Sequence, residues 1–183
     1  MSDIQLESRV AVVTGASRGI GQAIATALAS QGLNVMMSGR SADLLSSVAQ
    51  QIATTLRSEK QSGRIETHTA DVRDPVQMED LMAKTVDTFG RLDILINNAG
   101  VGHFQELVEL SVEDWNKVIE TNLSGVFFAC RAAIPLLKVS RGGWIINISS
   151  LAGSHPFTGG AAYCASKAGL DSVSEVLMQE LRY

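Results

Sequence analysis

Short apolar runs alternate with longer stretches of helical period along the whole chain. In the first half this pattern predicts three strand and helix pairs, Val10–Thr14 with Gly19–Ser30, Asn34–Ser38 with Ala42–Arg57, and Arg64–Thr69 with Pro75–Phe89. In the second half it predicts a strand over Leu92–Ile96, a long helix from Val112 to about Leu137, a strand over Gly143–Ser149 and a helix from Tyr163 to about Leu181. Strands that are almost wholly apolar are typical of a parallel sheet covered on both faces. The alternation therefore predicts a doubly wound α/β fold with right-handed crossovers.

Local signals fix several of the predicted helix ends. Ser41 is a candidate N-cap, Asp74-Pro75 places a capping residue before a proline at the first helical position, and Ser111-Val-Glu-Asp resembles a capping box. Pro135 lies inside the long helical pattern. Because proline lacks the N–H that a helix interior needs, we expect this helix to kink or end near Ile134.

Composition and charge narrow the class of protein. The chain has 183 residues and is 45% hydrophobic, which fits one globular domain over residues 1–183. Its 19 acidic and 15 basic residues give a net charge of -4 without blocks of like charge, so we expect neither a nucleic-acid partner nor a membrane. The polar start lacks the layout of a signal peptide, and no apolar run approaches membrane-spanning length. These features predict a cytoplasmic protein.

Cysteines and histidines give no sign of a metal site or a disulfide framework. Cys130 and Cys164 have no C-x-x-C spacing, and both are expected to be small buried residues. His68, His103 and His155 lie far apart in the sequence, so we expect surface or pocket-lining roles and no bound metal.

A glycine-rich turn follows the first strand and leads into a helix. It reads Thr-Gly-Ala-Ser-Arg-Gly-Ile-Gly over residues 14–21. Gly15 allows a sharp turn, Gly19 lets a pyrophosphate approach the backbone, and Gly21 lets helix and strand pack closely, while the helix N-terminus offers free N–H groups. Three glycines alone are a weak signal, but the flanking strand and helix strengthen it.

The G-x-x-x-G-x-G spacing of this turn resembles the cofactor signature of the short-chain dehydrogenase/reductase family. The resemblance makes the turn residues candidate cofactor ligands: Gly15, Ser17, Arg18, Gly19, Ile20 and Gly21. No acidic residue ends the second strand to bind the ribose hydroxyls of NAD. Arg40 stands there instead and, with Arg18, could bind a 2′-phosphate, so we expect NADP(H), with NAD(H) less favoured. The alternative is that both arginines are ordinary solvated surface charges.

Two further motifs match family positions along the cofactor. Asp71-Val72, after the third strand, matches the pair that contacts the adenine ring. In Asn97-Asn98-Ala99-Gly100, after the fourth strand, the resemblance implies that Asn98, Ala99 and Gly100 run alongside the adenosine ribose. Asp71 alone would more often be a capping acid, so this assignment depends on the resemblance.

The most specific chemistry is Tyr163-x-x-x-Lys167 at the head of the last predicted helix. The i, i+4 spacing places both side chains on one helical face. A phenol, with an ordinary pKa of about 10, is a poor acid or base at neutral pH unless a nearby cation such as an ammonium stabilises its phenolate. The resemblance implies that Tyr163 is the general acid/base, that Lys167 also binds the nicotinamide ribose, that Ser150 donates to the substrate oxygen, and that Asn122 anchors a water in the proton relay.

Together these motifs predict an oxidoreductase that transfers a hydride between NADP(H) and a small carbonyl or alcohol substrate. The loops Val101–Phe104 and Leu151–Phe157 are the candidate substrate contacts, but they do not select one compound. Two alternatives remain open: a non-catalytic NADP-binding or interaction protein, and, more weakly, an S-adenosylmethionine-dependent methyltransferase on a similar sheet.

The resemblance also implies strand order 3-2-1-4-5, with further family strands and a substrate lid absent from this chain. We therefore expect a domain that is incomplete at its C-terminal side, with the edge of Gly143–Ser149 and one side of the last helix uncovered. Apolar stripes on two predicted helices favour a homodimer or tetramer. These stripes comprise Trp115, Val118, Leu123 and Phe127, and Leu170, Val173, Leu177 and Leu181.

Overall fold

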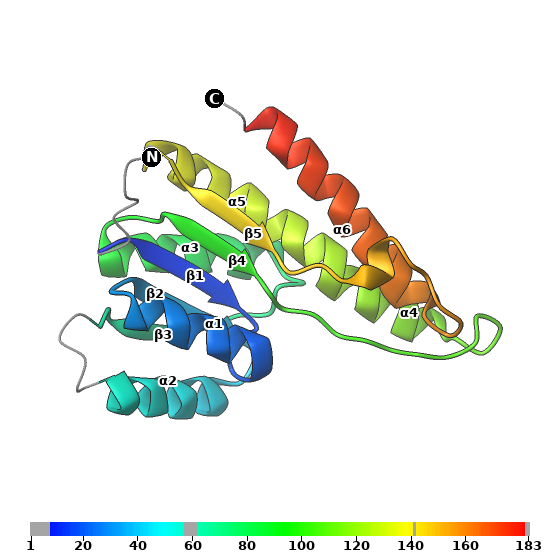
Figure 1. The fold of residues 1–183 in the computed structure, drawn as a ribbon, viewed down its shortest axis with the longest axis horizontal. Helices are drawn as coiled ribbons and strands as arrows, with labels where there is room; N and C mark the ends of the chain where they lie inside the picture. Colours follow the sequence, from blue (N-terminus) through cyan, green and yellow to red (C-terminus); the bar gives the residue numbers. More distant parts are fainter. Residues whose placement is uncertain (1–7, 57–61, 141, 182–183) are drawn as a thin grey trace.

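The computed structural model describes residues 8–56, 62–140 and 142–181. Within them five parallel strands form one sheet in the order β3-β2-β1-β4-β5 (Figure 1). The strands are β1 Val10–Thr14, β2 Asn34–Gly39, β3 Ile65–Thr69, β4 Ile94–Asn97 and β5 Trp144–Asn147. The predicted α/β class and strand order are confirmed.

Helices cover both faces of this sheet. On one face α1 and α2 pack over β1 and β2, and on the other α3, α5 and part of α6 enclose the larger core (Figure 1). The helices are α1 Gly19–Ser30, α2 Ala42–Leu56, α3 Pro75–Phe89, α4 Val112–Ile119, α5 Gly125–Val139 and α6 Ala161–Glu180, with a short 3-10 helix η2 at Leu151–Gly153. Arg57, the predicted end of the second helix, lies outside the described residues.

Burial falls from the centre of the sheet to both edges, β3 and β5. Every residue of β1 and of β4 is buried, as expected for central strands covered on both faces. In β5 no residue is buried, and Ile146 is 46% exposed. A recess beside this edge is lined by α5, β5 and α6 side chains, among them Leu137, Trp144 and Met178. The uncovered edge strand and last helix are thus as predicted.

The predicted helix starts are confirmed. The Asp74 carboxylate accepts hydrogen bonds from the backbone N–H groups of Val76 and Gln77, with Pro75 at the first helical position. Ser111 caps α4 by accepting from the Asp114 N–H at 3.0 Å. The Ser41 hydroxyl accepts from the Leu44 N–H at 3.4 Å.

The long second-half helix differs from the prediction in where it is interrupted. It does not end near Ile134: α5 continues through Pro135 to Val139, because Ala133 and Leu137 are buried in the core and hold this part of the helix on the sheet. The irregularity lies earlier, where Glu120–Ser124 form a π-helical segment, η1, between α4 and α5. Such segments are frequent at functional sites.

The continuous helical run Val112–Val139 also corrects the expectation about apolar length. By length and composition it could cross a membrane, with a mean hydropathy of 1.3. Its buried residues, including Val126 and Ala129, pack in the core against α3 and the sheet, which is the environment of a core helix.

The apolar stripes predicted for assembly are partly used inside this chain. Val118 and Leu170 are buried in the chain's own packing, whereas Trp115 is 36% and Phe127 51% exposed. The homo-oligomer therefore stays a prediction. The candidate contact surface is reduced to the exposed members of the stripes, such as Trp115 and Phe127.

Candidate active site

The glycine turn between β1 and α1 has the conformation that the sequence predicts. Gly15 and Gly19 adopt positive φ angles of 63° and 58°, which favour glycine. No side chain caps the start of α1, and a Cβ added at Gly19 would meet no atom within 4 Å. An uncapped helix N-terminus next to open space fits a bound pyrophosphate, which the free N–H groups and the helix dipole would stabilise.

Asn98 holds this turn through its side chain, a role that the sequence did not reveal. Its Nδ2 donates to the Thr14 carbonyl at 2.9 Å and to the Gly15 carbonyl at 3.1 Å. The Thr14 hydroxyl accepts from the backbone N–H groups of Asn98 and Ala99, both at 3.1 Å. A Cβ on Gly21 would collide with the Gly15 carbonyl and the Asn98 amide. Asn98 therefore orders the turn, and glycine is required for its close contact with α1.

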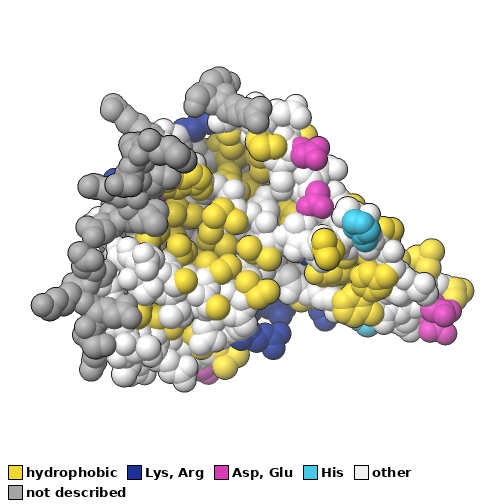
Figure 2. Space-filling model, viewed as in Figure 1, with side chains coloured by type: hydrophobic (Ala, Val, Ile, Leu, Met, Phe, Trp, Pro, Cys, Tyr) yellow, Lys and Arg dark blue, Asp and Glu magenta, His cyan; other side chains and the backbone are white. Residues whose placement is uncertain are grey.

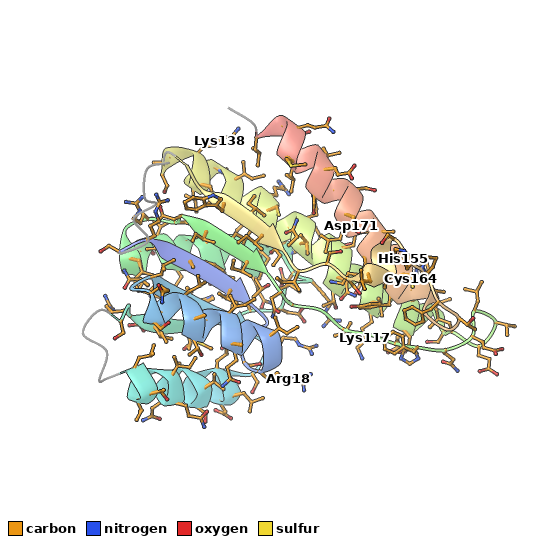
Figure 3. The ribbon with its side chains drawn as sticks, viewed as in Figure 1. Arg18, Lys117, Lys138, His155, Cys164 and Asp171 are labelled. Carbon is orange, nitrogen blue, oxygen red and sulfur yellow. The ribbon has the colours of Figure 1, made fainter. Side chains whose placement is uncertain are left out.

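The two arginines expected at the 2′ position lie at the same end of the sheet. Both Arg18 and Arg40 are exposed, and Arg18 projects outward from the start of α1 (Figure 3). The Ser17 hydroxyl approaches Gly39 from the turn, so the turn and the end of β2 adjoin. The Ser38 hydroxyl beside them is buried and has no hydrogen-bond partner among the described residues. This region thus combines positive charge with an unused polar group.

Asp71 and Val72 are less free to bind adenine than the sequence implied. Arg73 donates to both carboxylate oxygens of Asp71, at 3.0 Å from Nε to Oδ1 and at 2.6 Å from Nη2 to Oδ2. These bonds, together with the charge of nearby Arg40, lower the pKa of Asp71. The Val72 side chain packs against Gly125 in the core. A cofactor contact at Val72 would therefore use its backbone.

Tyr163 and Lys167 lie one turn apart near the start of α6, as predicted. The Lys167 ammonium lies 5.8 Å from the centroid of the Tyr163 ring and donates to the Ile148 carbonyl at 2.7 Å. Its pKa is lowered mainly by burial, while the charge of Asp171 acts in the opposite direction. Lys167 is thereby held between the end of β5 and the tyrosine ring.

Ser150 lies at the mouth of β5, at the start of η2. Its hydroxyl oxygen accepts from the Ala152 N–H at 3.2 Å, and no described residue accepts its proton. The neighbouring Ser149 hydroxyl donates to the Asp171 carboxylate, and a Cβ on Gly153 would collide with that carboxylate. Close packing of η2 on α6 at Lys167 and Asp171 thus fixes Ser150 beside this helix and leaves its O–H available as a donor.

Asn122 is buried in the π-helical segment and joins two parts of the site. Its Nδ2 donates to the Val101 carbonyl at 2.9 Å and to the Ser166 hydroxyl at 3.1 Å, and its Oδ1 accepts from the Val101 N–H at 2.8 Å. Ser166 in turn donates to the Tyr163 carbonyl. The side chain of Asn122 therefore ties the loop after β4 to the helix that carries Tyr163, so any bound water would rely on its backbone.

A partly buried polar chain links β4, β5 and α6, and nothing in the sequence motifs pointed to it. Asn97 Nδ2 donates to the side-chain Oδ1 of Asn147 at 2.9 Å, and Asn147 Nδ2 donates to the Ser174 hydroxyl at 2.8 Å. Asn97 also contacts the Cys130 thiol, whose pKa burial raises to about 11. A thiol of that pKa is neutral at physiological pH, so Cys130 is a packing residue and not a nucleophile.

The predicted site residues thus gather at the carboxyl edge of the sheet, at the right of Figure 1, where ligands bind in open α/β folds. The glycine turn and Asn98 lie beside β1 and β4, and the catalytic candidates lie beyond β5. The sequence missed the structural roles of the Asn98 side chain and of Ser166, and the aromatic contacts of Phe104.

Known proteins share this fold. Residues 9–183 match the family model described as short chain dehydrogenase. A 3-oxoacyl-[acyl-carrier-protein] reductase of Synechocystis is 39% identical over 180 residues, covering 96% of this chain and 69% of that protein. A metagenomic short-chain oxidoreductase in complex with NADP is 39% identical at a TM-score of 0.89, covering 97% of this chain and 78% of that one. A short-chain dehydrogenase/reductase from Burkholderia phymatum in complex with NAD is 29% identical at a TM-score of 0.91, covering 98% and 62%.

The chain belongs to the short-chain dehydrogenase family, as its fold, its motifs and these matches agree. The class is therefore that of the oxidoreductases.

Proposed function

We propose that this protein is an NADP(H)-dependent oxidoreductase that interconverts a carbonyl and an alcohol. The observation that carries the proposal is the pair Tyr163 and Lys167, with the buried Lys167 ammonium anchored on the Ile148 carbonyl and 5.8 Å from the tyrosine ring. When bound, the nicotinamide cofactor supplies or accepts the hydride.

The residues of this chain would handle the proton and the orientation of the substrate. Ser150 would donate its free O–H to the substrate oxygen, and Tyr163 would protonate that oxygen in reduction or deprotonate it in oxidation. The positive charge of Lys167 would stabilise the phenolate that forms. Asn122 would hold the helix start and the loop at Val101 in fixed relation, so that these groups converge.

Replacement of Tyr163 by Phe tests this function. This change removes one hydroxyl and keeps the ring that packs against Phe104. We expect turnover of a carbonyl panel with NADPH to fall by about 100- to 10,000-fold, because general acid–base catalysis is lost. The affinity for NADPH, measured by nicotinamide fluorescence, should stay within about twofold, because the change leaves the glycine turn and both arginines intact.

The matched control is Thr158→Ala, which removes an exposed hydroxyl from the neighbouring loop. It should keep the wild-type rate. NADPH binding without consumption by the wild type, across ketones and aldehydes, would favour the non-catalytic cofactor-binding alternative. Equal turnover in Tyr163→Phe and the wild type would exclude the proposed role of the tyrosine.

The preference for NADP(H) rests on Arg18 and Arg40. Figure 2 shows basic side chains gathered near the start of α1, and Arg40 lies close enough to Asp71 for its charge to lower the pKa of that carboxyl. Loss of a guanidinium from a 2′-phosphate should weaken NADPH binding about tenfold or more, since charge-assisted bonds are the strong ones. Arg40→Ala should therefore raise the Kd of NADPH and leave that of NADH unchanged.

A further inference from the structure

Two exposed phenyl rings lie next to the proposed catalytic tyrosine. Phe104 is 61% and Phe157 49% exposed, although both rings are large and apolar. The Phe104 ring meets Tyr163 edge to face at 5.6 Å between centroids and meets Phe157 at 5.8 Å. We call Phe104 and Phe157 the aromatic patch. Figure 2 shows hydrophobic side chains gathered at this end of the molecule, next to a histidine.

Each ring of the aromatic patch lies directly on a glycine. A Cβ on Gly102 would come within 2.8 Å of the Phe104 ring, and a Cβ on Gly160 would come within 2.7 Å of the Phe157 ring. The rings therefore rest on bare backbone, and a side chain at either glycine would displace them. This arrangement fixes their orientation in the absence of any ligand.

The two loops that carry the patch are joined to each other. The Gln105 N–H donates to the Gly159 carbonyl at 2.9 Å, and Gly159 adopts a positive φ of 78°. The loop after β4 is also tied through Val101 to Asn122. The patch is thus a preformed apolar surface whose position relative to Tyr163 is set by hydrogen bonds.

Charge around the patch disfavours an anionic ligand. Neither residues 101–110 nor residues 151–160 contain a lysine or arginine, whereas the first loop contains Glu106 and Glu109. His103 faces the Asp114 carboxylate at 3.5 Å, and Lys117 lines a different recess together with Arg73. A carboxylate or phosphate on the substrate would meet no lysine or arginine from either loop and would be repelled by the acidic side chains.

We infer that the site selects neutral carbonyl compounds, and the corresponding alcohols, that carry an aryl or alkyl group on the reacting carbon. The apolar group would cover the aromatic patch while the carbonyl oxygen meets Ser150 and Tyr163. This inference rests on the proposed function for the reaction itself. It separates this chain from an activity on 3-oxoacyl groups borne by an acyl-carrier protein, the substrate in the name of the Synechocystis relative.

The test uses two matched ligands that differ in one group. Binding of 1-phenylethanol and of 2-hydroxy-2-phenylacetate to the NADPH-saturated full chain is measured by calorimetry, because the reduced cofactor cannot oxidise either alcohol. Turnover of 2-butanone, 2-octanone and acetophenone is measured beside it. The neutral alcohol should bind about tenfold or more tightly than the carboxylate, and the catalytic efficiency should rise from 2-butanone to 2-octanone, since each added methylene can contribute to binding in an apolar pocket.

Variants locate the effect on the patch. The Phe157 ring contacts Phe104 and not Tyr163. Phe157→Ala should therefore weaken the binding of 1-phenylethanol about tenfold and reduce the increase in catalytic efficiency from 2-butanone to 2-octanone. Phe104→Ala should do the same, and Phe104→Leu should restore part of the affinity. Val108→Ala, at an exposed position of the same loop, is the control and should change neither quantity.

The outcomes separate the two proposals. Selective binding of 1-phenylethanol without turnover of any ketone would support the patch and contradict the proposed function. Binding of 2-hydroxy-2-phenylacetate as tight as that of 1-phenylethanol would contradict the inferred role of the aromatic patch. So would an equal loss of catalytic efficiency with 2-butanone and with 2-octanone in Phe157→Ala. Neither result would contradict the proposed hydride transfer.

Discussion

Polar groups at the amino end of the sheet have hydrogen-bond partners, whereas several at the carboxyl end do not find one among the described residues. At the amino end the fully buried Asp93 carboxylate accepts from the Val10 N–H at 2.9 Å and from Arg91 at 2.8 and 2.6 Å. At the carboxyl end the start of α1 is uncapped, the Ser38 hydroxyl is buried without a partner among the described residues, and no described residue accepts the Ser150 proton. Buried polar groups normally find partners, so groups left open in one place indicate where a ligand belongs.

This comparison separates residues that stabilise the fold from residues that serve a ligand. A change at the amino end should alter the free energy of unfolding and leave cofactor binding unchanged. A change at the carboxyl end should alter cofactor binding. It should also alter the free energy of unfolding where the same residue holds the glycine turn in place.

The largest effect on stability is expected from Asp93→Ala. Without the carboxylate the Val10 N–H stays buried and unpaired, and Arg91 loses its partner. We expect the free energy of unfolding to fall by about 3 kcal/mol, because a buried N–H is left unpaired and the charged bonds from the half-exposed Arg91 are lost with it. Urea unfolding measures this loss, and NADPH fluorescence of the folded variant should give the wild-type Kd.

Asp87→Ala is the control for this change, because Asp87 is exposed on α3. It should leave the unfolding curve unchanged. A loss of under about 1 kcal/mol in Asp93→Ala would mean that the amino end does not anchor the sheet, since that is the value of an ordinary surface pair.

At the carboxyl end the largest effect is expected from Gly21→Ala. The new Cβ would collide with the Gly15 carbonyl and the Asn98 amide, so the turn must move away from α1. We expect a stability loss of about 2 kcal/mol, typical of overpacking. NADPH binding should weaken about tenfold or more, because the phosphate site depends on backbone N–H groups held in place by this turn.

Gly90→Ala provides the matched control. Gly90 ends α3 with a φ of 82°, and a Cβ there would meet nothing within 4 Å. It should cost about 1 kcal/mol from backbone strain and leave NADPH binding intact. If both variants bound NADPH equally well, the turn would not be the phosphate site.

The fold was largely predictable because its signals are local. The buried strand Val10–Thr14 and the capped helix Pro75–Phe89 have the predicted bounds, since apolar periodicity and capping are read within a few residues. The helix does not end near Ile134, because core packing of Ala133 and Leu137 overrides the local cost of proline. The π-helical segment at Asn122 has no sequence signal of its own.

The candidate site divides in the same way. Motif spacing identified Gly15, Tyr163 and Lys167, because the turn and the i, i+4 pair are local features. The side-chain role of Asn98 depends on Thr14 and Gly15, which are 84 and 83 residues away, so spacing could not show it. The Asp93 contact with Val10, over 83 residues, was hidden for the same reason.

A smaller effect is expected from Ser174→Ala, which breaks the polar chain between β5 and α6. Asn147 Nδ2 would lose the hydroxyl that it bonds at 2.8 Å. We expect a loss of about 1 kcal/mol in the free energy of unfolding, because the amide is only partly buried and water can replace the partner. The exposed Ser172→Ala on the same helix should be neutral in the same urea titration. A neutral Ser174→Ala would show that the chain does not help to hold α6 on β5.

The smallest effect is expected from Arg73→Gln, and its pH dependence gives it a recognisable signature. Arg73 lowers the pKa of Asp71 below the ordinary value of 3.8, so the pair stabilises the folded state fully above that value. The contribution disappears as the pH falls through the lowered pKa, because the folded carboxylate then becomes protonated. Since the pair is partly exposed, the variant should lose about 0.5 kcal/mol at pH 7.

Urea unfolding of wild type and Arg73→Gln at pH 7, 5, 4 and 3 tests this dependence. The difference between the two proteins should be constant from pH 7 to 5 and shrink below pH 4. A difference that grows on acidification would contradict the ion pair as its source. Asp71 lies at the carboxyl end of the sheet, where the cofactor is proposed to bind. If Arg73→Gln bound NADPH more tightly than the wild type, Arg73 would be competing with the adenine ring for the Asp71 carboxylate. Asp71 would then belong to the residues that bind the cofactor.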